Sequence, residues 1–118
     1  MSNTAIALIF KFGMTLIAAW ITLGLMNGNP LLWIAIIALV GTAANYIFGD
    51  LVVLPNQSNL VASLGDGILA AVLAYIVAMF ISNFNTTFSA LAIYAAIVAV
   101  SEFYFHIFIQ NDDKVTPK

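Results

Sequence analysis

The sequence predicts an all-α fold in which one domain, residues 1–118, is an integral membrane bundle of four transmembrane helices. Hydrophobic residues make up 64% of the 118 positions and charged residues 7%, whereas a soluble domain carries about 25% charged residues. Mean hydropathy is +1.09. The apolar runs lack the alternation of barrel strands, and each is about 20 residues long, which suits a membrane-crossing helix. We therefore expect the chain to lie in a lipid bilayer.

Composition and motifs also exclude several classes of function. The chain has no cysteine, so a disulfide framework and a thiolate metal site are both excluded. The formal net charge is -2, and without a basic patch we expect no nucleic-acid partner. No glycine-rich phosphate loop appears, and no nucleophile lies beside a base in a recognisable motif. We expect neither enzymatic activity nor a cofactor.

The first half of the chain is expected to form two helices. The first covers residues 5–26 and is interrupted only by Lys11. The turn Asn-Gly-Asn-Pro at 27–30 follows, because asparagine and glycine accept positive φ and proline suits the start of a helix. The second helix is expected over 31–48, with Trp33 as an interfacial anchor.

The second half is also expected to form two helices, after a central polar interruption. The loop at 55–59 carries the main break in hydrophobicity. The third helix is expected over 60–81 and the fourth over 88–109, separated by the polar turn 82–87. Residues 110–118 form a polar tail.

Basic residues are few, and they set the expected orientation. Lys114 and Lys118 follow the last helix and Lys11 lies early in the first, while the turns at 27–30 and 82–87 hold no lysine or arginine. Because basic residues are enriched on the cytoplasmic side of membrane proteins, both termini are expected in the cytoplasm.

An even number of helices brings the ionisable residues near the helix ends to one side of the bundle. We call this group the charged layer, and it consists of Lys11, Asp50, Asp66, Glu102 and His106. The opposite end carries no ionisable side chain except tyrosine.

The charged layer is expected to be paired inside the bundle rather than to face lipid. A charged residue at the centre of a membrane helix costs ~2.5–3.5 kcal/mol. Lys11 is therefore expected to pair with Asp50, Asp66 or Glu102. Two interpretations stay open: a relay for protons or cations lined by Asp66, Glu102 and His106, and a buried salt-bridge network that fixes helix register.

Helical spacing indicates which way these side chains point. Glu102 and His106 are four residues apart and share a helix face. Asp66 begins a four-residue repeat with Ala70 and Ala74, and such small residues mark close helix contact in membranes. Glu102 and His106 offer two metal ligands, but the sequence shows no clear third, so no metal site is predicted.

Two uncharged polar residues lie in the second predicted helix. Thr42 and Asn45 are expected to pack against a neighbouring helix and to form interhelical hydrogen bonds, since such bonds are a common role of polar residues in membrane helices.

Four segments resemble a known family of small bacterial membrane proteins, the YndM-like family, which carries a domain of unknown function. They are KFGMT at 11–15, GDLVVLP at 49–55, NLVASLGDG at 59–67 and SEFYFH at 101–106. The chain departs from the family pattern at Asn56, where a basic residue is expected, and at Ser101, where glycine is expected. The resemblance implies four helices in the bacterial cell (plasma) membrane and supplies no activity.

Two functions are compatible with these observations. The first is a small integral membrane protein that acts through helix–helix interaction with itself or with partner proteins, using its small-residue faces. The alternative is a proton-coupled transporter or ion channel that uses the charged layer at the cytoplasmic end.

Overall fold

The computed structural model describes residues 3–48 and 58–111, and that part of the chain is helical apart from its turns. The main helices are α1 (Asn3–Ala19), α2 (Leu31–Ala44), α4 (Asn59–Phe80) and α5 (Phe88–Asn111), and a π-helical segment, η1 (Trp20–Gly24), continues α1. Four segments are long and apolar enough to cross a membrane. The all-α bundle predicted from the sequence is confirmed.

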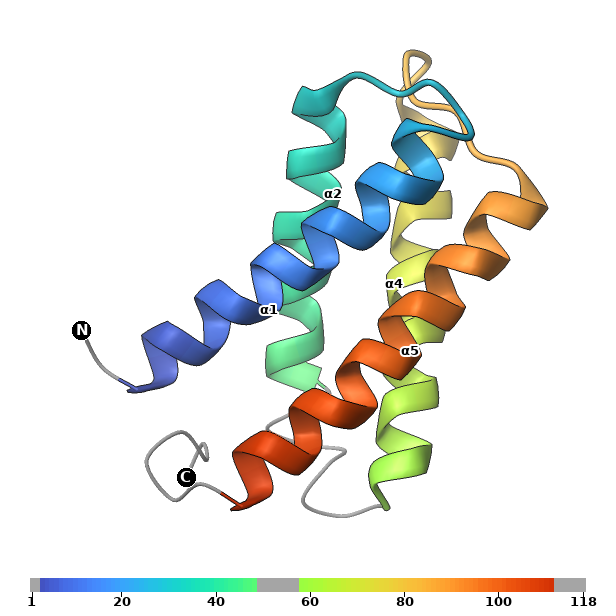
Figure 1. Cartoon of the computed structure of the whole chain (residues 1–118). Helices are drawn as coiled ribbons and strands as arrows, with labels where there is room; N and C mark the ends of the chain where they lie inside the picture. The colour runs from blue at the N-terminus through green and yellow to red at the C-terminus, as the bar shows by residue number, and fades with distance from the viewer. Residues whose placement is uncertain (1–2, 49–57, 112–118) are drawn as a thin grey trace.

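The helices are arranged in two adjacent pairs. α4 packs most extensively against α5, and α1 packs against α2; α1 also contacts α5, and α2 contacts α4. α1 begins and α5 ends at the same end of the bundle, opposite the two short turns (Figure 1). The buried apolar core includes Leu23, Ile34 and Tyr94.

The hydropathy pattern over 5–26 suggested one uniform α-helix, but the first membrane helix changes to a π-helix near its end. From Trp20 the backbone hydrogen bonds span five residues instead of four: the amide of Leu25 donates to the carbonyl of Trp20 at 2.9 Å. The hydroxyl of Thr22 donates to the carbonyl of Ala18 at 2.8 Å. A π-turn exchanges one backbone register for another without changing side-chain polarity, so hydropathy carries no sign of it.

Asn29 ties the two short turns together. Its side-chain amide donates to the carbonyls of Leu23 at 2.9 Å and Asn85 at 2.7 Å, and its side-chain carbonyl accepts from the amide of Asn85 at 2.8 Å. The preceding Gly28 has a φ of 70°, a backbone conformation that glycine adopts without steric cost. One buried side chain therefore joins the turn after η1 to the turn before α5.

Close packing of α4 on α5 depends on the absence of a side chain at Gly67. A Cβ at this position would lie 2.3 Å from the carbonyl oxygen of Ala95 and 3.0 Å from the Cβ of Ala99. The start of α4 is set by Ser58, whose hydroxyl accepts from the amide of Val61 at 3.2 Å and caps the helix. These contacts fix the depth of Asp66, next to Gly67.

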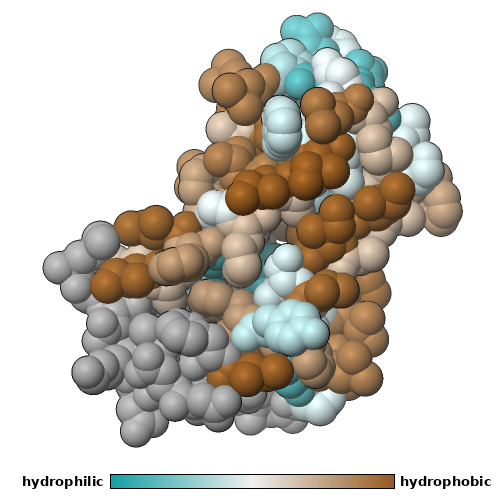
Figure 2. All heavy atoms as spheres, viewed as in Figure 1, coloured by the Kyte–Doolittle hydropathy of each residue, from teal (hydrophilic) through white to brown (hydrophobic). Residues whose placement is uncertain are grey.

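The outer surface of the bundle is largely apolar. Large hydrophobic side chains are exposed on all four helices, among them Ile17, Leu39, Ile68 and Val100. Hydrophobic residues cover the sides of the helices in Figure 2, and hydrophilic residues gather over the short turns. This distribution suits a bundle whose sides face lipid and whose turns reach the membrane surface.

Candidate functional site

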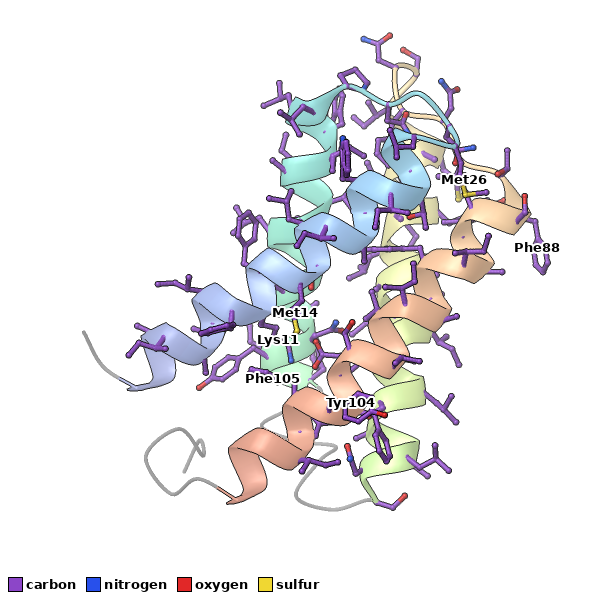
Figure 3. All side chains as sticks on the ribbon, in the orientation of Figure 1. Lys11, Met14, Met26, Phe88, Tyr104 and Phe105 are labelled. Carbon is purple, nitrogen blue, oxygen red and sulfur yellow. The ribbon has the colours of Figure 1, made fainter. Side chains whose placement is uncertain are left out.

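A buried ion pair joins the first membrane helix to the last. The ammonium of Lys11 lies 2.8 Å from Oε2 of Glu102, and the two side chains are 0% and 1% exposed. Lys11 points from α1 toward α5 (Figure 3). The distance is that of a charge-assisted hydrogen bond, which is roughly twice as strong as a neutral one.

His106 brings a second carboxylate into the same group. Its Nε2 lies 3.1 Å from Oδ2 of Asp66 and 3.4 Å from Oε2 of Glu102. The side chains of His106 and Asp66 are 0% and 2% exposed. We call Lys11, Asp66, Glu102 and His106 the buried ionic cluster; it draws on α1, α4 and α5.

The other ring nitrogen of His106 meets an ordered polar group on α4. Nδ1 lies 2.8 Å from Oδ1 of Asn59 and 3.2 Å from Oγ of Ser63. The Ser63 hydroxyl donates to the same Asn59 oxygen at 3.1 Å, and the Asn59 amide nitrogen donates to the carbonyl of Phe103 at 2.9 Å.

These partners assign the hydrogen on the imidazole. Because the nitrogen of Asn59 must face the Phe103 carbonyl, its oxygen faces His106 and accepts from Nδ1. Nδ1 therefore carries a hydrogen. In the neutral form of His106, Nε2 then has a lone pair, and it is this atom that faces the two carboxylates.

Apolar side chains pack beside the buried ionic cluster. The Lys11 ammonium lies 5.2 Å from the ring centroid of Phe105. Phe105 packs with Ala7 and Ala62, and Met14 lies against this group. Lys11, Met14 and Phe105 lie together between α1 and α5 in Figure 3. A cation over an aromatic face in a dry site is stabilised by electrostatic attraction.

Three residues of the cluster lie several residues inside the candidate membrane spans, and His106 lies one residue from the end of its span. Lys11 and Asp66 follow the first residues of their spans, Ala5 and Asn59, and Glu102 precedes Ile107, the last residue of its span. At a rise of 1.5 Å per residue, these positions are about 7–11 Å from the span ends. The cluster therefore lies toward one end of the candidate membrane spans.

The structure brings together four of the five residues of the charged layer. Asp50 lies outside the described residues. Sequence reasoning missed Asn59 and Ser63, although their spacing to Asp66 places all three on one face of α4. That face was available from the sequence, but uncharged polar residues near a helix start are also common as caps.

Thr42 and Asn45 are buried, at 5% and 0% exposure, but the interhelical hydrogen bonds expected of them are not present within residues 3–48 and 58–111. The hydroxyl of Thr42 and both polar atoms of the Asn45 amide have no hydrogen-bond partner there. Thr42 lines a groove between α1 and α2 whose other walls include Leu8, Phe12 and Leu39.

The sequence indicated two metal ligands and no clear third, and the structure supplies a candidate for the third. Asp66 of α4 joins Glu102 and His106 of α5, and one ligand atom from each lies within 4.8 Å of the others. The group thus offers one imidazole nitrogen and two carboxylates.

Charge counting shows what the buried ionic cluster can accommodate. Lys11 contributes one positive charge and the two carboxylates two negative charges. These four residues sum to zero when His106 is protonated and to one negative charge when it is neutral. The arrangement suits a group that takes up a proton or another cation.

Comparison with known proteins places the chain among membrane proteins. The family model described as "Protein of unknown function (DUF2512)" matches residues 2–116. The chain is 32% identical over 105 residues to the "Uncharacterized membrane protein YndM" of Bacillus subtilis (strain 168). The aligned region covers 88% of this chain and 59% of the relative. The chain thus spans somewhat more than half the length of that relative. No solved structure matches the chain.

Proposed function

Since the chain belongs to the DUF2512 family of proteins of unknown function, we propose a function from its own geometry: it is a small, non-enzymatic bacterial plasma-membrane protein that acts through helix–helix association. The first partner we propose is a second copy of the chain. The observation that carries the proposal is a concave apolar groove of about 600 Å³ on the outer face of α4 and α5.

The groove has the composition of a helix-packing surface. Its walls include Ala71 and Tyr75 of α4 and Leu91 and Ala92 of α5. Small residues let two membrane helices approach closely, which is how association gains van der Waals contact in lipid. Phe88 stands at the rim, is 88% exposed and points away from α5 (Figure 3).

A two-fold dimer uses these features symmetrically. When two copies share one orientation in the membrane, equal depths face each other, so the Phe88 of each copy would enter the groove of its partner. Such an isologous contact is closed and needs no other protein. The buried ionic cluster then has a structural part in this function, because it fixes how α1 and α4 lie against α5.

The experiment compares Ala92→Phe with Ala96→Phe in lipid vesicles. Both positions are exposed on α5, but only Ala92 lines the groove. Energy transfer between fluorescently labelled copies is expected in the wild type and in Ala96→Phe, and is expected to fall to the level of random encounter in Ala92→Phe. Equal transfer in the two variants, or none in the wild type, overturns the dimer.

The proposal includes an orientation with both termini in the cytoplasm. The chain has no cysteine, so single cysteines can be introduced cleanly. A membrane-impermeant maleimide added to intact cells is expected to label Asn83→Cys, in the turn before α5, and not Lys118→Cys. The reverse pattern contradicts this orientation, and labelling of both indicates that the protein inserts in two orientations.

A second candidate function is proton-coupled transport or ion conduction through the charged layer. It is favoured by one observation, the buried position of His106 Nε2 close to the carboxylates of both Asp66 and Glu102. The test is ion flux in dye-loaded liposomes under a membrane potential. Flux in the wild type that is lost in Glu102→Gln supports transport; absence of flux in the wild type contradicts it.

A further inference from the structure

We propose that Asp66, Glu102 and His106 form a binding site for a divalent transition-metal ion of the Zn²⁺ type. The site draws on two helices and goes beyond association in the membrane. It uses Nε2 of His106, Oδ2 of Asp66 and a carboxylate oxygen of Glu102 as ligand atoms.

Two of the three ligand-atom separations are close to those that a tetrahedral ion requires, and the third, between Asp66 and Glu102, is at most 4.8 Å. Zinc lies about 2.0–2.2 Å from imidazole nitrogen and carboxylate oxygen, so two ligands of one ion are about 3.3–3.6 Å apart. Nε2 of His106 lies 3.1 Å from Oδ2 of Asp66 and 3.4 Å from Oε2 of Glu102.

A second observation comes from Asp66. Its Oδ2 is buried and accepts no hydrogen bond from the described residues, while the side chain is 2% exposed. In the neutral form of His106, Nε2 lies 3.1 Å from Oδ2 but has a lone pair and no hydrogen to donate. A buried carboxylate oxygen that accepts no hydrogen bond is costly in a dry site, and a metal ion at this point would satisfy it.

The outer partners of His106 are those of a metal-binding histidine. A metal-bound imidazole donates its other N–H to an oxygen acceptor, which fixes the ring and the tautomer. Here Nδ1 lies 2.8 Å from Oδ1 of Asn59, which is itself oriented by its bond to the Phe103 carbonyl. The imidazole is thus held with Nε2 toward Asp66 and Glu102.

The kinds of ligand atom at the site indicate which divalent ions it would bind. One imidazole and two carboxylates, with no sulfur, suit Zn²⁺, Mn²⁺, Fe²⁺ and Co²⁺, whereas Mg²⁺ and Ca²⁺ prefer oxygen ligands alone. Three protein ligands are the number found in zinc sites that keep a fourth position for water or another molecule.

The positive charge of Lys11 is expected to weaken metal binding at this site. A divalent ion neutralises the two carboxylates, and the ammonium that lies 2.8 Å from Glu102 Oε2 then leaves an excess positive charge. Lys11 therefore opposes the metal ion, although it stabilises the metal-free protein. Replacing Lys11 with a neutral side chain of similar length is expected to tighten metal binding.

The experiment measures Zn²⁺ binding to the full chain in detergent micelles by calorimetry, with Co²⁺ as an optical probe. One ion per chain is expected, and bound Co²⁺ is expected to give the intense visible absorption of a tetrahedral site. Asp66→Asn, which keeps the side-chain shape, is expected to weaken binding more than 100-fold. Asp113→Asn in the polar tail is the matched control and is expected to bind as the wild type does.

Two further variants separate a metal site from a merely structural network. Asn59→Ala leaves all three ligands in place and is expected to weaken binding 10–100-fold, the effect of losing an outer partner of a metal-bound histidine. Lys11→Met is expected to bind Zn²⁺ more tightly than the wild type. Absence of binding by folded wild-type protein overturns the site, and so does binding that Asp66→Asn leaves unchanged.

Discussion

Lys11 Nζ and Glu102 Oε2 lie 2.8 Å apart, although 91 positions separate the two residues in the chain. Each side chain is completely or almost completely buried. The contact links α1 to α5 and so closes the bundle between its first and last membrane helices. Because both side chains are buried, loss of one partner leaves the other as a buried charge, which does not happen in an exposed surface pair.

Lys11→Met is expected to destabilise the metal-free protein by about 3–5 kcal/mol, because it removes the cation nearest to a buried carboxylate. The measurement is unfolding of purified protein from detergent micelles by a denaturing detergent. The additional change Glu102→Gln is expected to recover most of this loss, since it also removes the buried charge. If the double variant is as unstable as the two single losses combined, the two residues do not act as a pair.

Gly67→Ala is expected to destabilise the bundle by about 1–3 kcal/mol, the range of overpacking in a close-packed interior. The new Cβ would meet the backbone of Ala95 at 2.3 Å, which cannot move without displacing α5. Gly65→Ala is the matched control on the same helix, because apart from its chain neighbours and the backbone of its own helix turn nothing described lies within 4 Å of the new Cβ. It is expected to raise stability by up to about 1 kcal/mol through helix propensity. Equal effects of the two changes would contradict the close packing of α4 on α5.

The fold class and the family followed from composition and from short motifs. Long apolar runs need the internal hydrogen bonding of a helix in lipid, so the four helices were predictable without any tertiary information. The segments around Lys11 and Glu102 resembled the YndM-like family. The match of residues 2–116 to the DUF2512 family model and the 32% identity to the YndM protein of Bacillus subtilis confirm this assignment. The π-helical segment η1 was not predictable, because a change of backbone register leaves the hydropathy pattern intact.

The sequence allowed us to predict which residues belong to the candidate site, but not which of them contact one another. Helical periodicity placed Glu102 and His106 on one face, and it placed Asp66 on a face with small residues. Which acid meets Lys11 depends on the order of the helices around the bundle and on their relative depth, which one sequence does not encode locally. The Asn59 contact to His106 was missed for the same reason, since it depends on the close approach of α4 and α5.

Asn29→Ala is expected to lower stability by about 1–3 kcal/mol, because it removes three side-chain hydrogen bonds, each worth about 0.5–1.5 kcal/mol. Two of those bonds join the turn after η1 to the backbone of Asn85, and the third reaches the carbonyl of Leu23. Asn83→Ala, at an exposed position in the turn before α5, is the control and is expected to change stability by no more than about 0.5 kcal/mol. Unfolding measurements on both variants test the link, and an equally small effect of Asn29→Ala would show that the two turns are not coupled through this side chain.

Tyr94→Phe is expected to leave stability unchanged within about 1 kcal/mol or to raise it. The ring of Tyr94 is fully buried in the main core, but its hydroxyl has no hydrogen-bond partner among the described residues. A buried hydroxyl without a partner costs free energy in the folded state, so its removal gives up no hydrogen bond and keeps the packing of the ring. Tyr94→Leu, which also removes the aromatic ring, is the comparison and is expected to destabilise the core clearly. Thermal unfolding in detergent measures both variants. A loss of stability in Tyr94→Phe as large as that in Tyr94→Leu would show that the hydroxyl is bonded in the membrane-embedded protein, most simply through a buried water molecule.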